Sequence, residues 1–227
     1  MGEPAPELIV EPDLEAASAR CAALIAGAVT EALTQRGAAH IALSGGSTPR
    51  RSLKLLGPLV SDWRGVQLWF CDERCVAPDD EQANARMADE ALDAPGATWH
   101  RMQGELGPEP GAAAYERELA DIVLDLAVLG IGEDGHTASL FPGHAALGAS
   151  GRVVGVRGAP KPPAERISLT LDTLDGARAR LLLVSGHEKA AALAAMRGER
   201  SAQVPSSLLE RADLTIVTTR DALAPAR

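Results

Sequence analysis

Aromatic residues are scarce in this 227-residue chain, at only 3% of the positions. Its core must therefore be filled by Ala, Leu and Val, and 46% hydrophobic residues suffice for a sizeable core. Cysteine is scarce as well, with only Cys21, Cys71 and Cys75. An odd number without a framework spacing excludes a disulfide scaffold and indicates a reducing compartment. Cys71 and Cys75 do not form a C-x-x-C pair, so ordinary thiols are favoured over a zinc or redox site.

Positive charge is also in deficit, with a net charge of −9 and a pI near 5.1. An acidic surface argues against binding to nucleic acid or to an anionic membrane, so an anionic ligand requires a local cationic patch. Long apolar runs are missing, because no stretch approaches the ~20 residues of a membrane helix. The start, MGEPAPELIVEPDLE, lacks the basic and apolar regions of a signal peptide. We expect a cytoplasmic protein without a membrane partner.

What the chain does contain is an alternation of strand-like and helix-like segments. Short apolar runs predict strands over residues 41–44, 66–71, 126–131, 166–171, 179–185 and 213–219. Helical spacing predicts helices over residues 13–35, 50–56, 83–92, 112–124 and 186–196, the first ending at Gly37. Pro- and Gly-rich composition predicts a loop over residues 93–111 and a small irregular excursion near residues 142–165.

This alternation is typical of one α/β domain, here residues 1–227, with a mainly parallel, Rossmann-like sheet and helices on both faces. In such sheets, ligands bind beyond the carboxyl ends of the strands. The loops after Ser44, Cys71, Leu129 and Ser185 are therefore expected to meet there.

The first of these loops, SGGSTP, runs from Ser44 to Pro49. Its two glycines let backbone N–H groups approach a ligand, and Thr48 is a candidate N-cap with Pro49 in the first helical turn. Such a loop suits a phosphate group, although it is also simply a tight turn with a good cap. The P-loop pattern is missing, so a nucleoside triphosphate is not implied.

Two further loops carry charge. In CDERC, Arg74 could pair with phosphate or carboxylate and Asp72 could position a cation, a hydroxyl or a water, or both could simply be solvated. In GHEKAAAL, Lys189 stands near a helix start, where a cation opposes the helix dipole. A bound anion would remove that conflict, but a solvated lysine fits equally well.

The fourth loop, GIGEDGH, contains the G-x-G-x-x-G pattern of dinucleotide sites. Glu133 and Asp134 would repel a pyrophosphate there, and no acid follows near residues 152–157 for a ribose, so we reject a dinucleotide. His136 is instead a candidate general base, since a nearby carboxylate can fix its tautomer. No H-E-x-x-H or comparable ligand set indicates a metal, and no G-x-S-x-G elbow indicates a serine hydrolase.

Taken in order, several segments resemble the 6-phosphogluconolactonase family. They are LSGGSTP, WFCDERCVAPDDEQANARMADEAL, LAVLGIGEDGHTASLFPGH, RISLTL and LLVSGHEKAAAL, between about Ile41 and Val217. The resemblance implies a fold related to glucosamine-6-phosphate deaminase and ribose-5-phosphate isomerase. It also implies hydrolysis of 6-phospho-D-glucono-1,5-lactone in the oxidative pentose phosphate pathway, without a metal or organic cofactor.

The resemblance also assigns roles to residues. It makes His136 the base that activates water. Apart from the resemblance, the neighbouring acids Asp72 and Asp134 are both candidates to stabilise the imidazolium or to orient the water, and the sequence does not decide between them. The resemblance implies substrate or phosphate contacts for Ser44, Gly45, Gly46, Ser47, Thr48, Arg74, Arg166 and Lys189. DDEQANA departs from the family's usual run, but Asn84 is in place.

Two other functions stay in view. A glucosamine-6-phosphate deaminase would carry a ring-opening glutamate where this chain has Phe141, and tends to carry tyrosine in place of Arg74. A sugar-phosphate sensor would need no histidine and would be joined to a basic DNA-binding segment, which is missing here. We expect a small-molecule sugar-phosphate lactone as partner, no nucleic acid, and a monomer or weak homo-oligomer.

Overall fold

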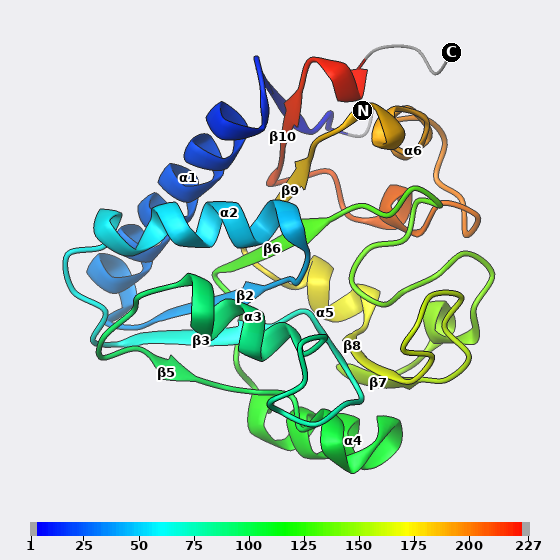
Figure 1. The fold of residues 1–227 in the computed structure, drawn as a ribbon, viewed down its shortest axis with the longest axis horizontal. Helices are drawn as coiled ribbons and strands as arrows, with labels where there is room; N and C mark the ends of the chain where they lie inside the picture. Colours follow the sequence, from blue (N-terminus) through cyan, green and yellow to red (C-terminus); the bar gives the residue numbers. More distant parts are fainter. Residues whose placement is uncertain (1–3, 224–227) are drawn as a thin grey trace.

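A seven-stranded parallel sheet forms the centre of the computed structural model, which describes residues 4–223 (Figure 1). The strand order is β1-β10-β9-β6-β2-β3-β5, and every neighbouring pair is parallel. The strands are β1 (Glu7–Glu11), β2 (Ala39–Leu43), β3 (Val66–Phe70), β5 (Thr98–Trp99), β6 (Leu126–Gly130), β9 (Ala179–Val184) and β10 (Leu214–Thr219). The predicted parallel α/β architecture is confirmed.

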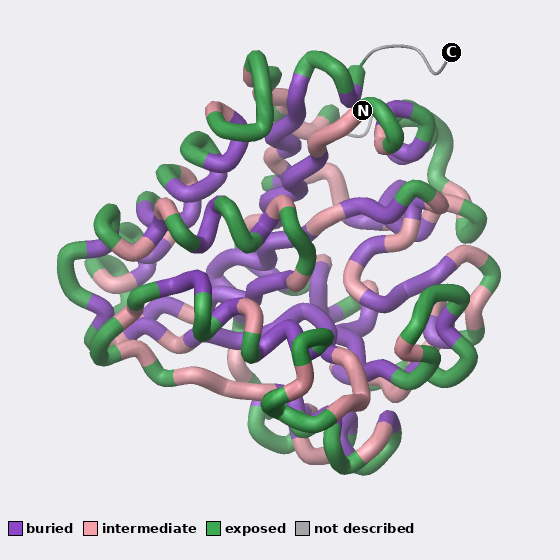
Figure 2. The backbone as a smooth tube through the Cα atoms, in the orientation of Figure 1, coloured by how far each residue is buried: buried purple, intermediate pink, exposed green. Residues whose placement is uncertain are grey.

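Six α-helices accompany the sheet in residues 4–223: α1 (Leu14–Arg36), α2 (Ser47–Leu56), α3 (Asn84–Ala91), α4 (Pro108–Leu119), α5 (Leu171–Asp175) and α6 (Ala190–Met196). In Figure 1, α1, α2 and α3 lie beside one another, while α4 lies apart and packs against β7 (Val153–Val156). Buried residues concentrate in the strands and on the inward faces of these helices (Figure 2). The core is built mainly from Ala, Leu, Val and Ile, as the scarcity of aromatics predicted.

Helix α1 shows how local sequence sets the element bounds. The Asp13 side chain accepts a hydrogen bond from Ala16 N–H at 2.9 Å, and Gly37 ends the helix in the left-handed region at φ 74°. By length and composition alone, α1 could cross a membrane, which corrects the expectation that no stretch of the chain has the length and apolar character of a membrane helix. Its face from Ala17 to Ala32 is nevertheless buried in the core of the domain, as in the core helix of a globular protein.

A second, antiparallel sheet corrects two predictions. It consists of β4 (Asp72–Arg74), β8 (Arg166–Leu169) and β7, in the order β4-β8-β7. The segment near 142–165 is therefore not wholly irregular, and RISL does not join the central sheet. The reason is pairing: β8 runs antiparallel to β4 and places Arg166 opposite Arg74.

Other boundaries also differ from the predictions. Helix α2 begins at Ser47 with Gly46 as its N-cap, so Thr48 is not the cap. Helix α4 begins at Pro108, whose missing N–H is not needed in a first turn, and ends at Leu119. The segment 93–111 therefore holds β5, a short 3₁₀ helix (η2, Gly104–Leu106) and the start of α4. Strand β1 and helix α5 were not predicted.

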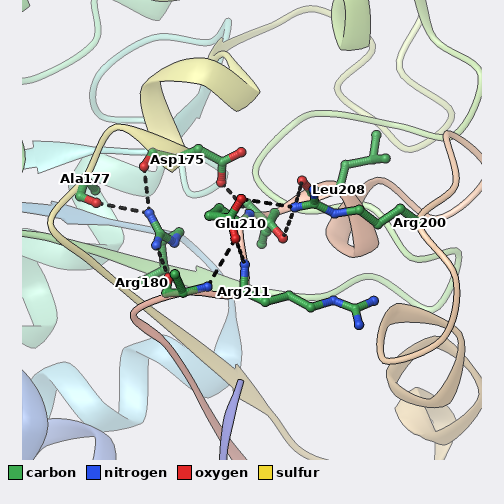
Figure 3. A network of polar contacts seen from close by, with 9 residues as sticks. Asp175, Ala177, Arg180, Arg200, Leu208, Glu210 and Arg211 are labelled. Carbon is green, nitrogen blue, oxygen red and sulfur yellow. Dashed lines mark hydrogen bonds and ion pairs between the residues drawn. The ribbon is translucent and has the colours of Figure 1, made fainter. Parts of the chain in front are cut away.

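A network of charged residues lies at the amino ends of β9 and β10 (Figure 3). The Arg180 guanidinium, buried at 3% exposure, donates hydrogen bonds to the carbonyls of Asp175, Ala177 and Ala212. The Asp175 carboxylate accepts from Glu210 N–H at 2.7 Å, and the Glu210 carboxylate accepts from the next two backbone N–H groups. These contacts tie α5 to the segment before β10.

Candidate active site

A cavity of about 330 Å³ opens at the carboxyl ends of β2, β3, β6 and β9. The four loops predicted to meet do meet there. Of the predicted site residues, all but Asp134 line this cavity: Ser44, Gly45, Gly46, Ser47, Thr48, Asp72, Arg74, His136, Arg166 and Lys189. Asp134 lies behind one of the lining residues, His136, to which it is hydrogen bonded.

The SGGST loop presents the amino end of α2 to the cavity. Gly46 adopts φ 110°, which favours glycine, and leaves the first turn of α2 without a side-chain cap. A Cβ on Gly45 would come 1.8 Å from the Asn84 amide oxygen, so the backbone and this side chain are closely packed. Thr48 and Ser185 bring their hydroxyls within 3.2 Å across the cavity wall. Unpaired N–H groups, a helix dipole and hydroxyls together suit a phosphate.

His136 and Asp134 form a hydrogen-bonded pair, with Nδ1 2.5 Å from the Asp134 carboxylate. If Nδ1 carries the proton toward this carboxylate, Nε2 is left as an acceptor, and in residues 4–223 it has no hydrogen-bond partner. A Cβ on Gly132 would come 2.0 Å from Nδ1, so only glycine leaves space for the pair. Gly132 of this motif therefore accommodates an imidazole and a carboxylate, where a dinucleotide site would hold pyrophosphate.

The electrostatics of the pair suit a base near neutral pH. Burial lowers the pKa of His136 below its usual value, opposed by the hydrogen bond and charge of Asp134. Burial raises the pKa of Asp134, but the hydrogen bond and charge of His136 outweigh it, so the net shift is downward. At pH 7 the imidazole is thus neutral and the carboxylate ionised.

Asp72 has a different surrounding. Its carboxylate accepts a hydrogen bond from the Ser139 hydroxyl at 2.6 Å, and its carbonyl accepts from the Asn84 amide at 2.9 Å. It is only 5% exposed and makes no hydrogen bond to His136 within the described chain. Of the two acids that the sequence left open, Asp134 is therefore the one that contacts the imidazole.

Glu73 anchors the short strand β4, which carries Asp72 and Arg74, to helix α3. Its carboxylate, at 3% exposure, accepts from the backbone N–H groups of Arg74, Asn84 and Ala85, each at 2.7 Å. Two of these groups belong to the first turn of α3, whose dipole favours a carboxylate. Burial nevertheless raises the pKa of Glu73 to about 7, against these hydrogen bonds. Glu73 was not among the predicted site residues, because only the fold brings α3 next to β4.

Four cations line the cavity: Arg74, Lys161, Arg166 and Lys189. Arg74 donates to the Gln82 carbonyl at 2.7 Å, and Lys189 lies 3.7 Å from the Glu133 carboxylate. Arg166, predicted as a substrate contact, donates to backbone carbonyls of residues 161–163. Lys161 was missed, and its only signal was a basic residue before two prolines in a loop leading to the RISL strand.

Phe141 and the backbone contact between Gly135 and Ser206 surround His136. The Phe141 ring lies 4.6 Å from the His136 ring, and the Arg166 guanidinium carbon lies 5.6 Å from the centre of the same phenyl ring. The carbonyl of Gly135 accepts a hydrogen bond from Ser206 N–H at 2.9 Å. Among residues 4–223 no three His, Cys, Asp or Glu side chains cluster as a metal site would require.

Comparison with known proteins shows similarity over most of the chain. Residues 12–218 match the model of the glucosamine-6-phosphate isomerases/6-phosphogluconolactonase family. A 6-phosphogluconolactonase of Streptomyces coelicolor is 35% identical over 89% of this chain and 87% of its own length. One of Mycobacterium leprae is 40% identical over 81% and 83% of the two chains.

Solved structures show the same fold. A 6-phosphogluconolactonase of Shewanella baltica superposes with a TM-score of 0.86 and 27% identity, over 94% of this chain and 97% of the other. A monomeric glucosamine-6-phosphate deaminase, at 22% identity, has a TM-score of 0.84 over 97% and 100% of the two chains and shares the fold. The chain belongs to the glucosamine-6-phosphate isomerase/6-phosphogluconolactonase family.

Proposed function

We propose that this protein hydrolyses 6-phospho-D-glucono-1,5-lactone to 6-phospho-D-gluconate, with His136 as the general base. The observation that carries the proposal is the His136–Asp134 pair. His136 lines the same cavity as the SGGST loop, and within residues 4–223 its Nε2 has no hydrogen-bond partner. The loop can bind the phosphate of the substrate, and the histidine can activate the water that attacks the ester carbon. The names of the relatives support the same substrate.

The chemistry needs no covalent enzyme intermediate, because a δ-lactone is already an activated ester. His136 Nε2 takes a proton from a water as the water oxygen bonds to C1 of the lactone. The bond between C1 and the ring oxygen then breaks, and the ring oxygen receives a proton from the imidazolium. Asp134 stabilises the imidazolium between the two transfers, since its carboxylate stays at Nδ1 throughout.

The phosphate end does no chemistry in this mechanism. Its binding free energy holds C1 against the water, which lowers the entropic part of the barrier. Candidate contacts are the N–H groups of Gly46 and Ser47, the Thr48 hydroxyl, and the cations Arg74 and Lys189. No step requires a metal or an organic cofactor.

Phe141 argues against amino-sugar deamination as the main activity. Its ring is 1% exposed and packs on His136, and a phenyl group cannot transfer a proton during ring opening. A deaminase would release ammonia from glucosamine 6-phosphate. We expect no ammonia above background.

The direct test generates the lactone in situ, because it hydrolyses spontaneously, and follows its loss with and without the protein. We expect loss far above the buffer rate, and a buffer-like rate would overturn the proposal. We also propose a cytoplasmic enzyme of the oxidative pentose phosphate pathway that is a monomer or a weak homo-oligomer.

A further inference from the structure

Lys161 lies in the loop between β7 and β8 and lines the candidate active-site cavity. Its side chain forms no hydrogen bond or ion pair with any residue in the part of the chain that the structure describes. The other three cavity cations all have protein partners: the Gln82 carbonyl for Arg74, the backbone of 161–163 for Arg166, and Glu133 for Lys189. Among the described residues, Lys161 is therefore the cavity cation whose donors are all unused by the protein, whereas Arg74 and Lys189 each keep one protein contact beside the donors they can offer to a ligand.

The loop holds Lys161 in place although it lies at the surface. Arg166, at 6% exposure, donates from Nη2 to the Lys161 carbonyl at 3.0 Å and to the Pro162 carbonyl at 3.2 Å. Its Nε donates to the Pro163 carbonyl at 3.0 Å. Ala159 N–H closes the loop on the Ala164 carbonyl at 2.9 Å. A buried guanidinium thus fixes the backbone from which the lysine extends, which reduces the entropy lost when the lysine binds a ligand.

The loop that carries Lys161 lies at the histidine end of the cavity. Arg166, which donates to the Lys161 carbonyl, has its guanidinium carbon 5.6 Å from the centre of the Phe141 ring, and that ring lies 4.6 Å from the His136 ring. The positive charge of Lys161 also helps to lower the pKa of His136, although burial lowers that pKa more. A cation near a general base opposes the imidazolium. The same cation favours negative charge on the carbonyl oxygen, which develops as water attacks.

We propose that Lys161 contacts the C1 oxygen of the lactone, stabilising the oxyanion and afterwards the carboxylate of the product. This inference rests on the proposed lactone hydrolysis. Lys161 acts through its positive charge and exchanges no proton with the substrate. The phosphate is left to the SGGST loop, Arg74 and Lys189, so the two anionic ends of the product are bound by different cations.

A kinetic test compares Lys161→Met with Lys161→Arg. For Lys161→Met we expect a loss of kcat of roughly tenfold to a hundredfold with little change in KM. We also expect the acid limb of kcat/KM to move to higher pH, because a charge that lowers the pKa of His136 is gone. Lys161→Arg keeps the charge and should keep both the pH profile and most of the rate. An unchanged kcat and an unchanged acid limb in Lys161→Met would overturn the proposal.

A binding test separates this inference from the proposed function. Calorimetry would compare 6-phospho-D-gluconate with glucitol 6-phosphate, which has the phosphate but lacks the carboxylate. Lys161→Met should weaken binding of the first about tenfold and leave the second unchanged, whereas Lys189→Met should weaken both. Equal losses for both ligands in Lys161→Met would overturn the assignment to C1. A wild-type protein without lactonase activity would instead overturn the proposed function. The difference in binding between the two ligands would still decide whether Lys161 contacts the carboxylate.

Discussion

The two ends of the central sheet use polar side chains in opposite ways. At the amino ends of β9 and β10, Arg180 donates to three backbone carbonyls, and the Asp175 and Glu210 carboxylates accept from backbone N–H groups (Figure 3). At the carboxyl ends, polar groups remain open: His136 Nε2 and Lys161 Nζ have no partner within residues 4–223. The first arrangement stabilises the fold, and the second is suited to a ligand.

Arg166 shows that the same distinction applies within the site. Arg166 lines the cavity but makes three hydrogen bonds to carbonyls, as Arg180 does. A cavity-lining cation is therefore not a substrate contact by position alone. What matters is how many hydrogen bonds the cation already makes to the protein: Arg166 makes three, whereas Lys161 makes none within residues 4–223.

The largest effect should follow from removing the open imidazole. We expect His136→Ala to lower kcat by about 10²–10⁴-fold with little change in KM, because the base acts on the water and not on the phosphate. Steady-state kinetics of lactone loss would measure both constants. His187→Ala, at an exposed histidine outside the cavity lining, is the control and should keep its activity. A wild-type kcat in His136→Ala would remove the base assignment.

Asp134→Asn should come next, with a loss of kcat on the order of 10²-fold, because an amide can bind the wrong tautomer of His136. The Asp134 carboxylate raises the pKa of the imidazole, so its removal should move the acid limb of kcat/KM to lower pH. That shift is opposite in sign to the one expected for Lys161→Met. A shift in the same direction for both variants would contradict the proposed geometry.

At the opposite end of the sheet, Arg180→Met should change stability and not chemistry. It leaves the carbonyls of Asp175, Ala177 and Ala212 without their donor, which should cost about 1–3 kcal/mol of unfolding free energy. Urea unfolding would measure the loss, with Arg197→Met at an exposed site as the control. The kcat of the folded variant should be unchanged. A loss of kcat without a loss of stability would contradict the purely structural role of Arg180.

The smallest effect concerns Glu73. Because its folded pKa, about 7, lies above the ordinary value of 4.5, the folded state binds a proton that the unfolded state releases between these values. This group therefore makes the protein less stable as pH rises from about 5 to 7, by something on the order of 1 kcal/mol. Glu73→Gln should lose that pH dependence in urea unfolding. Parallel pH dependences for wild type and variant would show that Glu73 is not buried as described.

Much of the site could be predicted from the sequence, because the end of a buried strand is marked by the change from an apolar run to a polar or glycine-rich loop. Apolar runs followed by SGGST, DER and EDGH placed Ser44, Asp72, Arg74 and His136 at one edge of a parallel sheet. Spacing also identified α1 with its cap at Gly37. Local patterns of this kind depend on neighbouring residues, which a sequence displays directly.

The rest depends on pairing between distant segments. Strand β1 lies at the sheet edge, and its short segment ELIVE is flanked by acids and prolines. β7 lies in a Gly- and Pro-rich segment and becomes a strand only through pairing with β8. Thr48 was expected to cap α2, but Gly46 takes that position while the Thr48 hydroxyl approaches Ser185. Lys161 enters the site because Arg166 holds its loop, which no local pattern encodes.

The pH dependence of kcat/KM for the lactone tests the central claim most directly, because it reports the ionisation of the base in the free enzyme. We predict that, after subtraction of the buffer rate, kcat/KM rises with pH along one ionisation below the usual histidine value of 6.5. It should then stay level through neutral pH. A profile that is flat below pH 6.5, or that falls as the imidazole loses its proton, would contradict this prediction.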